Sequence, residues 1–129
     1  MKRHLFCAVA AAILFAVLPL EAQIRGFRQE QLKEWEFSKD GSNWETVAVP
    51  HSYNAEDGHS PYYYRGKATY RCDLRITDIK KTHYLFFEGA AQAAVVKVNG
   101  EQVAIHKGGY TPFSVNITEA LTKGVNRLE

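Results

Sequence analysis

The chain has 129 residues, a formal net charge of +2 at pH 7 and a hydrophobic content of 46%. This length fits at most one ordinary domain, and the apolar content is sufficient for a hydrophobic core. Because acidic and basic residues are nearly balanced and form no basic cluster, we do not expect nucleic acid as a partner.

The N-terminus has the three parts of a secretory signal peptide. Basic residues at 2–4 precede an apolar run at 5–18, which Pro19 ends, and the small residue Ala22 suits cleavage. The run is shorter than the roughly 20 apolar residues that a membrane-spanning helix needs. We therefore predict a cleaved signal peptide at 1–22 and a secreted or periplasmic protein without a stable membrane span.

The following residues are predicted to lead into a folded domain at 35–129. Residues 23–34 form a polar lead-in, and 27–35 is the best helical segment of the chain, although a weak one. The first predicted strand is 44–49, which Pro50 ends because proline lacks a backbone N–H.

The loop at 54–66 combines aromatic rings with amide, carboxylate and guanidinium groups. Sugars present apolar faces that rings can cover and hydroxyls that such polar groups can hydrogen-bond. The loop is therefore a candidate sugar-binding segment. The alternative is structural: its tyrosines pack into the domain and Arg65 pairs with a carboxylate. Glu56 and Asp57 are adjacent and point in different directions, so they are a poor acid and nucleophile pair for glycoside hydrolysis.

An alternation of apolar and polar residues at 68–77 predicts a half-buried strand. Cys72 lies on the apolar side of this strand, so we predict a small core residue and not a nucleophile. Since Cys7 belongs to the predicted signal peptide, no disulfide within the mature chain is expected.

Three strands are predicted in the middle of the domain. The run at 83–87 is apolar on both sides, which is typical of a central strand. The runs at 94–98 and 101–105 flank Asn99-Gly100, and this pair between two strands predicts a hairpin with a type I′ turn.

The segment 106–113 is predicted to be a bend, because two glycines permit positive φ and a proline fixes φ. Tyr110 lies at its tip, and Phe113 returns to the core. We interpret the bend as a structural feature and not as a site.

The last predicted elements are a strand at 113–117 and a helical turn at 118–121. An alternating pattern then begins at 125 and stops with the sequence, whereas a strand usually runs about five or six residues. We therefore expect an incomplete final element, which would leave an aggregation-prone sheet edge unpaired.

Short strands separated by turns predict an all-β sandwich. No nucleophile elbow surrounds a serine, Gly108-Gly109 is not followed by the residues of a phosphate loop, and no histidine has metal-ligand spacing. We therefore assign no catalytic residue, no metal site and no cofactor. The five histidines are His4, His51, His59, His83 and His106.

Many segments of the predicted domain resemble the N-terminal sugar-binding domain of glycoside hydrolase family 2, which includes β-galactosidases and β-glucuronidases. Each segment is short, but their order and spacing together are specific. The segments are Trp35-Glu36-Phe37, Trp44, Val49-Pro50-His51, Tyr53-Asn54, Tyr63-Tyr64-Arg65-Gly66, Tyr70-Arg71, Phe87-Glu88-Gly89-Ala90, Val96-Lys97-Val98-Asn99-Gly100, His106-Lys107-Gly108-Gly109-Tyr110-Thr111-Pro112-Phe113, Asn116-Ile117-Thr118, Leu121 and Gly124-Val125-Asn126-Arg127-Leu128. Typical members have tryptophan where Tyr53 stands and often aspartate where Asn116 stands.

The resemblance implies a jelly-roll, galactose-binding-like β-sandwich that lacks its last strands. In the family, an immunoglobulin-like domain and a (β/α)₈ barrel follow, and the barrel carries both catalytic glutamates. The resemblance therefore implies no catalytic residue in this chain. It does imply sugar-facing roles for Asn54, Asp57 and Arg65.

The whole protein implied by the resemblance is an exported, retaining exo-β-glycosidase, with β-galactosidase as the first choice and β-glucuronidase as the second. Its expected partners are a glycan and the downstream domains of its own chain. A stand-alone module that binds carbohydrate or another surface partner is the alternative.

Overall fold

A computed structural model describes residues 28–59, 61–62 and 64–129, with only the backbone at Glu56 and His59. The chain divides into two compact units, and the second, Leu32–Glu129, contains every strand described below. The predicted signal peptide at 1–22, and residues 23–27 of the predicted lead-in, lie outside the described residues. Within the described part, no helix is long and apolar enough to cross a membrane.

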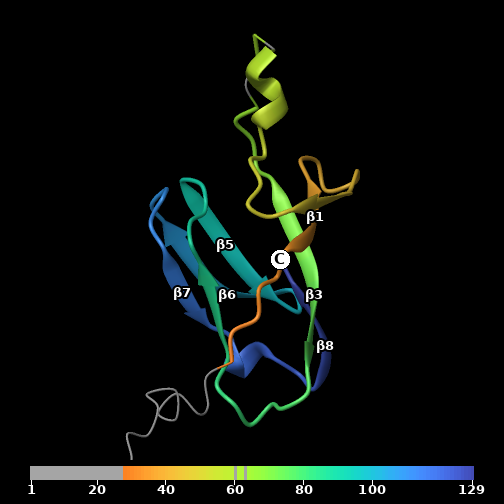
Figure 1. Ribbon diagram of the computed structural model, residues 1–129, viewed down its shortest axis with the longest axis vertical. Helices are drawn as coiled ribbons and strands as arrows, with labels where there is room; N and C mark the ends of the chain where they lie inside the picture. Colours follow the sequence, from red (N-terminus) through yellow and green to blue (C-terminus); the bar gives the residue numbers. More distant parts are fainter. Residues whose placement is uncertain (1–27, 60, 63) are drawn as a thin grey trace, which may run out of the picture. The chain divides into compact units, whose positions relative to one another are not determined.

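The described residues of the second unit form an all-β sandwich, which confirms the predicted fold class. Six strands form one sheet in the order β2-β1-β3-β8-β5-β6, and β4 and β7 form a second sheet (Figure 1). All described strand pairs are antiparallel. The elements are β1 (Glu34–Ser38), β2 (Glu45–Ala48), the 3-10 helix η2 (Ala55–His59), β3 (Thr69–Ile76), β4 (Tyr84–Phe87), β5 (Ala93–Val98), β6 (Glu101–Lys107), β7 (Phe113–Asn116), the 3-10 helix η3 (Thr118–Ala120) and β8 (Gly124–Leu128).

Strand β1 corrects the weak helix expected at 27–35. Residues 28–33 contain no helix, and Glu34–Ser38 pairs with both β2 and β3. Trp35 and Phe37 face inward and alternate with Glu34 and Glu36, so the segment has the period of a strand. The Trp35 indole N–H donates to the Leu32 carbonyl at 2.9 Å, which fixes the entry into the strand.

The hairpin and the long strand follow the sequence pattern closely. Asn99 and Gly100 have φ values of 53° and 85°, the left-handed geometry that a type I′ turn needs. Strand β3 spans Thr69–Ile76, and Cys72 is half-buried against the core on its inner face. Both predictions are confirmed.

Strand β4 is not a central strand, so that expectation was wrong. Among the described residues it pairs only with β7. Leu85 and Phe87 pack against the core, whereas Tyr84 and Phe86 on the other face are 61% and 64% exposed. A run that is apolar on both sides does not reveal which side is covered.

Strand β8 runs five residues, a usual strand length, and pairs with β3 along all of them. With β5 it shares only the pair Val98↔Leu128 and the backbone bonds next to it. Its inward residues Asn126 and Leu128 are buried, and the core that surrounds them is contributed by both sheets. That core comprises Ile76, Val96, Val98, Val115, Ile117, Leu121 and Leu128.

Asn126 is a fully buried amide that connects three segments. Its Oδ1 accepts the Thr122 N–H at 2.8 Å and the Asn99 side-chain amide at 2.9 Å. Its Nδ2 donates to the Thr122 carbonyl at 2.8 Å and to the Gly124 carbonyl at 3.2 Å. The amide therefore joins the turn before β8 to the turn of the β5–β6 hairpin, and these bonds offset the cost of burying it.

Candidate functional site

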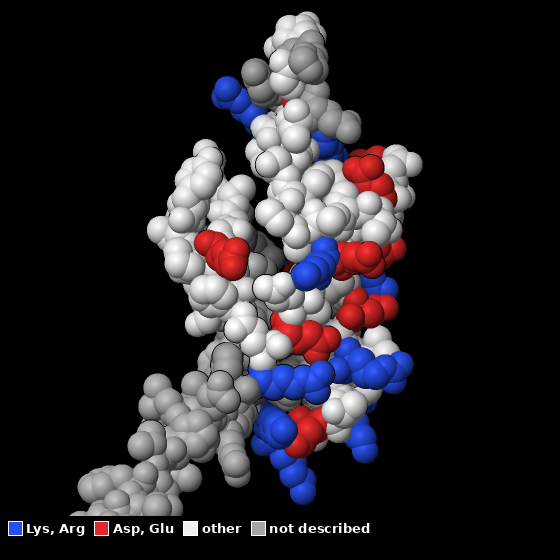
Figure 2. Space-filling view, in the orientation of Figure 1, with Lys and Arg blue, Asp and Glu red and all other residues white. Residues whose placement is uncertain are grey.

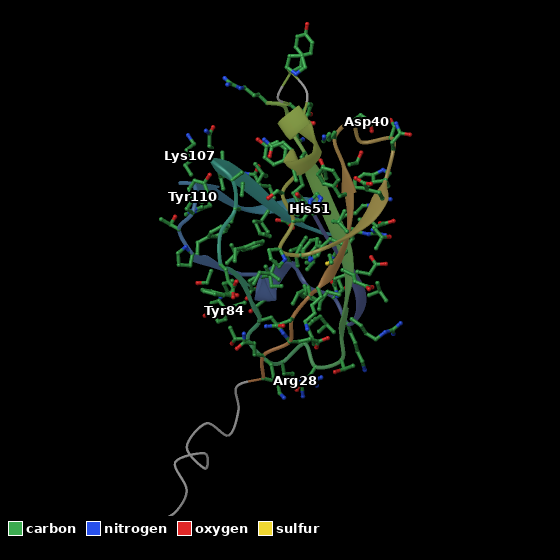
Figure 3. The ribbon with its side chains drawn as sticks, turned by 45° about the horizontal axis from the view of Figure 1, so that its top comes forward. Arg28, Asp40, His51, Tyr84, Lys107 and Tyr110 are labelled. Atoms are coloured by element: carbon green, nitrogen blue, oxygen red, sulfur yellow. The ribbon has the colours of Figure 1, made fainter. Side chains whose placement is uncertain are left out.

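Four loops lie at one end of the sandwich, which we call the loop end. Strand β1 ends where β3 begins, since Ser38 pairs with Thr69. Strands β3 and β5 are both antiparallel to β8, so both begin at this end. Strand β6 ends here, because its last residue Lys107 pairs with Ala93 at the start of β5. The second sheet contributes the end of β4 and the start of β7, which are paired through Phe87 and Phe113. Figure 3 marks two of the loops by Asp40 and Tyr110. The loops are 39–44, 49–68, 88–92 and 108–112.

Asp57 fastens the longest loop to the sandwich. Its Oδ2 accepts the Tyr64 backbone N–H at 3.0 Å, and its Oδ1 lies 3.5 Å from the Lys39 ammonium. The carboxylate is only 17% exposed. The Tyr64 hydroxyl lies 3.0 Å from the Lys39 carbonyl and 2.7 Å from the Lys67 carbonyl, and its single proton can be donated to either. These contacts hold the two sides of the loop together over the end of β1.

The predicted sugar-facing residues lie in this one loop but in different environments. Asn54 is half-buried, and its carbonyl accepts the Asp57 N–H at 3.1 Å as η2 begins. Arg65 is exposed beside Tyr64. The loop therefore presents a guanidinium to solvent, while the Asp57 carboxylate is turned toward Lys39 and Tyr64.

An aromatic cluster lies under the base of the same loop. The His51 and Phe37 rings are 4.8 Å apart, and Tyr70 lies 4.9 Å from Phe37. His51 Nδ1 and the Tyr70 hydroxyl share a hydrogen bond of 2.8 Å. Burial, with a smaller contribution from Tyr53, raises the pKa of the Tyr70 phenol, so this hydroxyl keeps its proton at neutral pH. We interpret the cluster as the foundation of the loop.

The bend at 108–112 is built as a shaped turn, as the sequence predicts. The Gly108 N–H donates to the Gln92 carbonyl at 3.0 Å, which joins the bend to the 88–92 loop. The Phe113 ring stacks on His106 at 3.9 Å and on Phe87 at 4.6 Å, and so returns the chain to the core. Tyr110 remains 99% exposed with a φ of 68°.

Charged residues on the outer face of the large sheet are paired with one another. Glu36 accepts from Arg71 at 2.7 Å and from Arg127 at 3.1 Å, and Arg127 also lies 2.9 Å from Asp73. The Arg71 guanidinium lies 3.6 Å from the Trp44 ring centre. Figure 2 shows acidic and basic groups interleaved along this side of the molecule. This network is a surface of satisfied ion pairs and does not present two opposed free carboxylates.

The described side chains provide binding groups and no catalytic constellation. Among them, no three His, Cys, Asp or Glu residues lie close enough together to hold a metal ion. Burial, with a smaller contribution from Asp73, raises the pKa of the Cys72 thiol to about 12, so it is not a nucleophile at neutral pH. The loop end can therefore contact a polar ligand through an amide, a guanidinium and an exposed ring.

Sequence reasoning found the loop but not the residues that hold it. Lys39 contacts Asp57 from the 39–44 loop, and Tyr64 contacts it from seven residues further along the 49–68 loop. The spacing of these residues in the sequence predicts neither contact. The exposure of Tyr110 is also a structural result, because the sequence gives only its position at the tip of a bend.

Comparison with known proteins identifies relatives of most of the β-domain. Residues 48–129 match the family described as glycosyl hydrolase 2 galactose-binding domain-like. A putative β-glucuronidase of Formosa agariphila is 34% identical over 104 residues, covering 78% of this chain and 13% of that protein. A β-galactosidase of Thermoanaerobacter pseudethanolicus is 40% identical over 96 residues, covering 70% of this chain and 13% of that protein.

The same likeness appears among solved structures. The β-glucuronidase of Bacteroides uniformis superposes with a TM-score of 0.70 at 32% identity, over 78% of this chain and 14% of that one. The chain thus spans about one seventh of the length of these relatives.

Proposed function

Because the chain belongs to the galactose-binding-like domain family of the glycosyl hydrolase 2 enzymes, we propose that it is the N-terminal sugar-binding domain of an exported, retaining exo-β-glycosidase. The catalytic acid and nucleophile of that enzyme would lie in domains beyond this chain. A β-galactoside is the substrate that we favour. The contribution of this domain is to hold part of the sugar, through side chains at its loop end.

The observation that supports this proposal is the construction of the long loop. Asp57, Lys39 and Tyr64 lock its shape, and the cluster of His51 with Tyr70 supports its base. Rigid placement of polar side chains lowers the entropy cost of binding a ligand. A loop that is fastened this firmly and carries an exposed guanidinium is suited to orient a substrate.

We assign different roles to the three residues of this loop. Asn54 and Arg65 contact sugar hydroxyls or a carboxylate, through an amide and a guanidinium. Asp57 orients the loop that carries both of them, because its two oxygens already contact Lys39 and Tyr64.

Substitution in the enzyme that carries this domain tests the assignment. Arg65→Ala should lower kcat/KM about tenfold, mainly through KM, because it removes one charge-assisted contact with the substrate. Arg75→Ala is the matched control, since Arg75 is an exposed arginine of β3 near the opposite end of the sandwich. Equal activity of the two variants would contradict a role for Arg65. The 129-residue chain alone should not hydrolyse nitrophenyl β-galactoside.

A β-glucuronide is the second candidate substrate. The exposed Arg65 guanidinium favours it, because arginine pairs in a bidentate manner with a carboxylate such as that of a uronic acid. Comparing the effect of Arg65→Ala on nitrophenyl β-galactoside and β-glucuronide separates the two substrates. A larger loss on the glucuronide supports the second candidate, and an equal loss supports the first.

A stand-alone carbohydrate-binding module is the alternative from another class. Its loop end would look the same, so the discriminating observation lies in the gene. A reading frame that continues past the codon for Glu129 into a barrel supports the enzyme, and a stop codon at that point supports the module.

A further inference from the structure

Tyr110 has a strained backbone conformation and no packing that compensates for it. Its φ of 68° lies in the left-handed region, which is unfavourable for a residue with a bulky side chain. The other described residue of this kind, Asn99, is of a type that tolerates positive φ, and its side chain accepts the Arg127 N–H. The Tyr110 ring is 99% exposed, so its burial stabilises nothing. Strain without a structural gain indicates a functional position.

The bend that carries this ring is fixed by hydrogen bonds. The Gly108 N–H donates to the Gln92 carbonyl at 3.0 Å, which joins the bend to the 88–92 loop. His106 Nε2 lies 3.2 Å from both the Gly108 carbonyl and the Thr111 hydroxyl, so these contacts close the bend on itself. A fixed backbone therefore presents the ring to solvent, and such preorganisation lowers the entropy cost of binding a ligand.

Two exposed side chains that donate hydrogen bonds lie next to the bend. Lys107 is the last residue of β6, and Gln92 belongs to the loop that is bonded to Gly108. Figure 3 shows Lys107 and Tyr110 on the same side of the sandwich. An exposed ring can cover the apolar C–H face of a pyranose, while an ammonium and an amide bond its hydroxyls. The composition of this surface therefore suits a sugar ring.

This surface is separate from the long loop that carries Asn54 and Arg65. The long loop leads into β3, and the bend follows β6. Strands β3 and β6 stand three strand positions apart in the large sheet, which is about 14 Å at the usual spacing of strands. That distance exceeds the width of one monosaccharide. One sugar at the long loop would therefore not cover Tyr110, whereas a further ring of the same glycan could do so.

We propose that Tyr110 is the platform of a second sugar-binding position, on which a further pyranose ring of the glycan stacks. The inference rests on the proposed function for the class of ligand. An exo-glycosidase removes the terminal sugar, so every further ring of the glycan belongs to the leaving group. Lys107 and Gln92 donate hydrogen bonds to hydroxyls of the ring that stacks. The backbone of the bend keeps its structural role, and the Tyr110 ring adds affinity for longer glycans.

Titration of the 129-residue chain with a β-linked galactotriose tests the platform directly. The amide resonances of residues 92 and 107–111 should shift to saturation, and Tyr110→Ala should weaken this binding about fivefold, because the stacking surface is lost. Tyr110→Phe should keep it. Tyr84→Ala is the matched control, since Tyr84 is 61% exposed and begins β4, away from the loop end. Absence of these shifts, or equal affinity of Tyr110→Ala and the wild type, would overturn the proposal.

Thermal unfolding separates a binding role of the ring from a structural one. Tyr110→Gly removes the ring and adopts a φ of 68° without steric strain. Its melting temperature should therefore be no lower than that of the wild type, although its affinity for the sugar falls. A lower melting temperature would show that the ring stabilises the fold. If only the longer enzyme lost stability with Tyr110→Gly, another domain would cover the ring, and either result would overturn the proposal.

Kinetics of the enzyme that carries this domain give a further test. Tyr110→Ala should lower kcat/KM about fivefold on galactotriose and leave it unchanged on methyl β-galactoside, which has no second ring. Equal effects on the two substrates would contradict the platform. An enzyme that hydrolyses neither substrate would contradict the proposed function, and the titration would still decide whether Tyr110 binds sugar.

Discussion

Replacing Asn126 by alanine should cost more stability than the loss of any exposed amide in the domain. The side chain is fully buried and makes three short hydrogen bonds of 2.8–2.9 Å, to the N–H and carbonyl of Thr122 and to the Asn99 amide. Each such bond contributes about 1 kcal/mol net, so we expect a loss of about 3 kcal/mol in the free energy of unfolding. For a domain of this size, that corresponds to a fall in melting temperature of at least about 12 °C.

Urea unfolding of the wild type, Asn126→Ala and Asn43→Ala measures this difference. Asn43 is the control because it is an exposed asparagine whose amide donates to Asp40 in a surface turn. Its removal should cost less than about 1 kcal/mol, since water replaces the lost partner. The usual error of such comparisons is about 0.5 kcal/mol. The reasoning would be refuted if the losses in unfolding free energy of Asn126→Ala and of the control differed by no more than this error.

A double-mutant cycle tests whether the amide joins two turns. Asn99→Ala removes the partner at 2.9 Å. It also removes the acceptor of the Arg127 N–H at 3.0 Å, a donor to the Ala120 carbonyl at 3.1 Å and a residue that tolerates its φ of 53°, so its own cost has several sources. The cycle cancels the backbone cost and isolates the pair. We expect a coupling of at least about 0.5 kcal/mol between the two positions, whereas fully additive losses would mean that the contact stabilises nothing.

Three further predictions concern backbone conformation and titration. Gly100→Ala should lower the free energy of unfolding by about 1–2 kcal/mol, because its φ of 85° strains an alanine even though no atom lies within 4 Å of the added Cβ. Gly58→Ala is the control, since it has equal space and no positive φ, and it should be nearly neutral in the same urea titration. The Cys72 thiol should react with a thiol reagent at pH 8 far more slowly in the native protein than in urea. Its folded pKa of about 12 exceeds the unfolded value of 9.0, so the free energy of unfolding should fall as pH rises from 9 to 12. Cys72→Ala should not show this fall. Hydrogen bonds from Arg71 and, to a smaller extent, Arg127 hold the pKa of Glu36 below its usual range. The melting temperatures of the wild type and Glu36→Gln should therefore differ at pH 7 and converge as pH falls through the folded pKa of Glu36. A constant difference across that range would contradict the ion pairs.

Short-range chemistry made some elements predictable from sequence alone. Asn99-Gly100 needs only its own backbone preferences to define a turn, and the alternation around Cys72 needs only the period of a strand. Both are local signals, and both were confirmed. The helical turn before β8 was also predicted, and η3 occupies Thr118–Ala120.

Other features depend on contacts between distant segments. The strand at Glu34–Ser38 was missed although Trp35 and Phe37 alternate with polar residues, because the preceding polar residues favoured a weak helix. The exposure of Tyr84 on β4 depends on which layers cover that sheet, and no periodicity encodes this. In the candidate site, the contact of Asp57 with Lys39 joins two loops, so the sequence could propose the carboxylate but not its partner.

The place of β8 in the large sheet has a consequence for synthesis on the ribosome. Strands β1 to β3 and the β5–β6 hairpin lie on either side of β8, and no other described strand joins them. Translation delivers β8 after every other described strand, so the two halves of the sheet must wait for residues 124–128 to leave the exit tunnel. Until then each half exposes a strand edge, and non-local pairing of this kind is slow and prone to aggregation. The two halves of the sheet should therefore join in one step, after β8 has emerged.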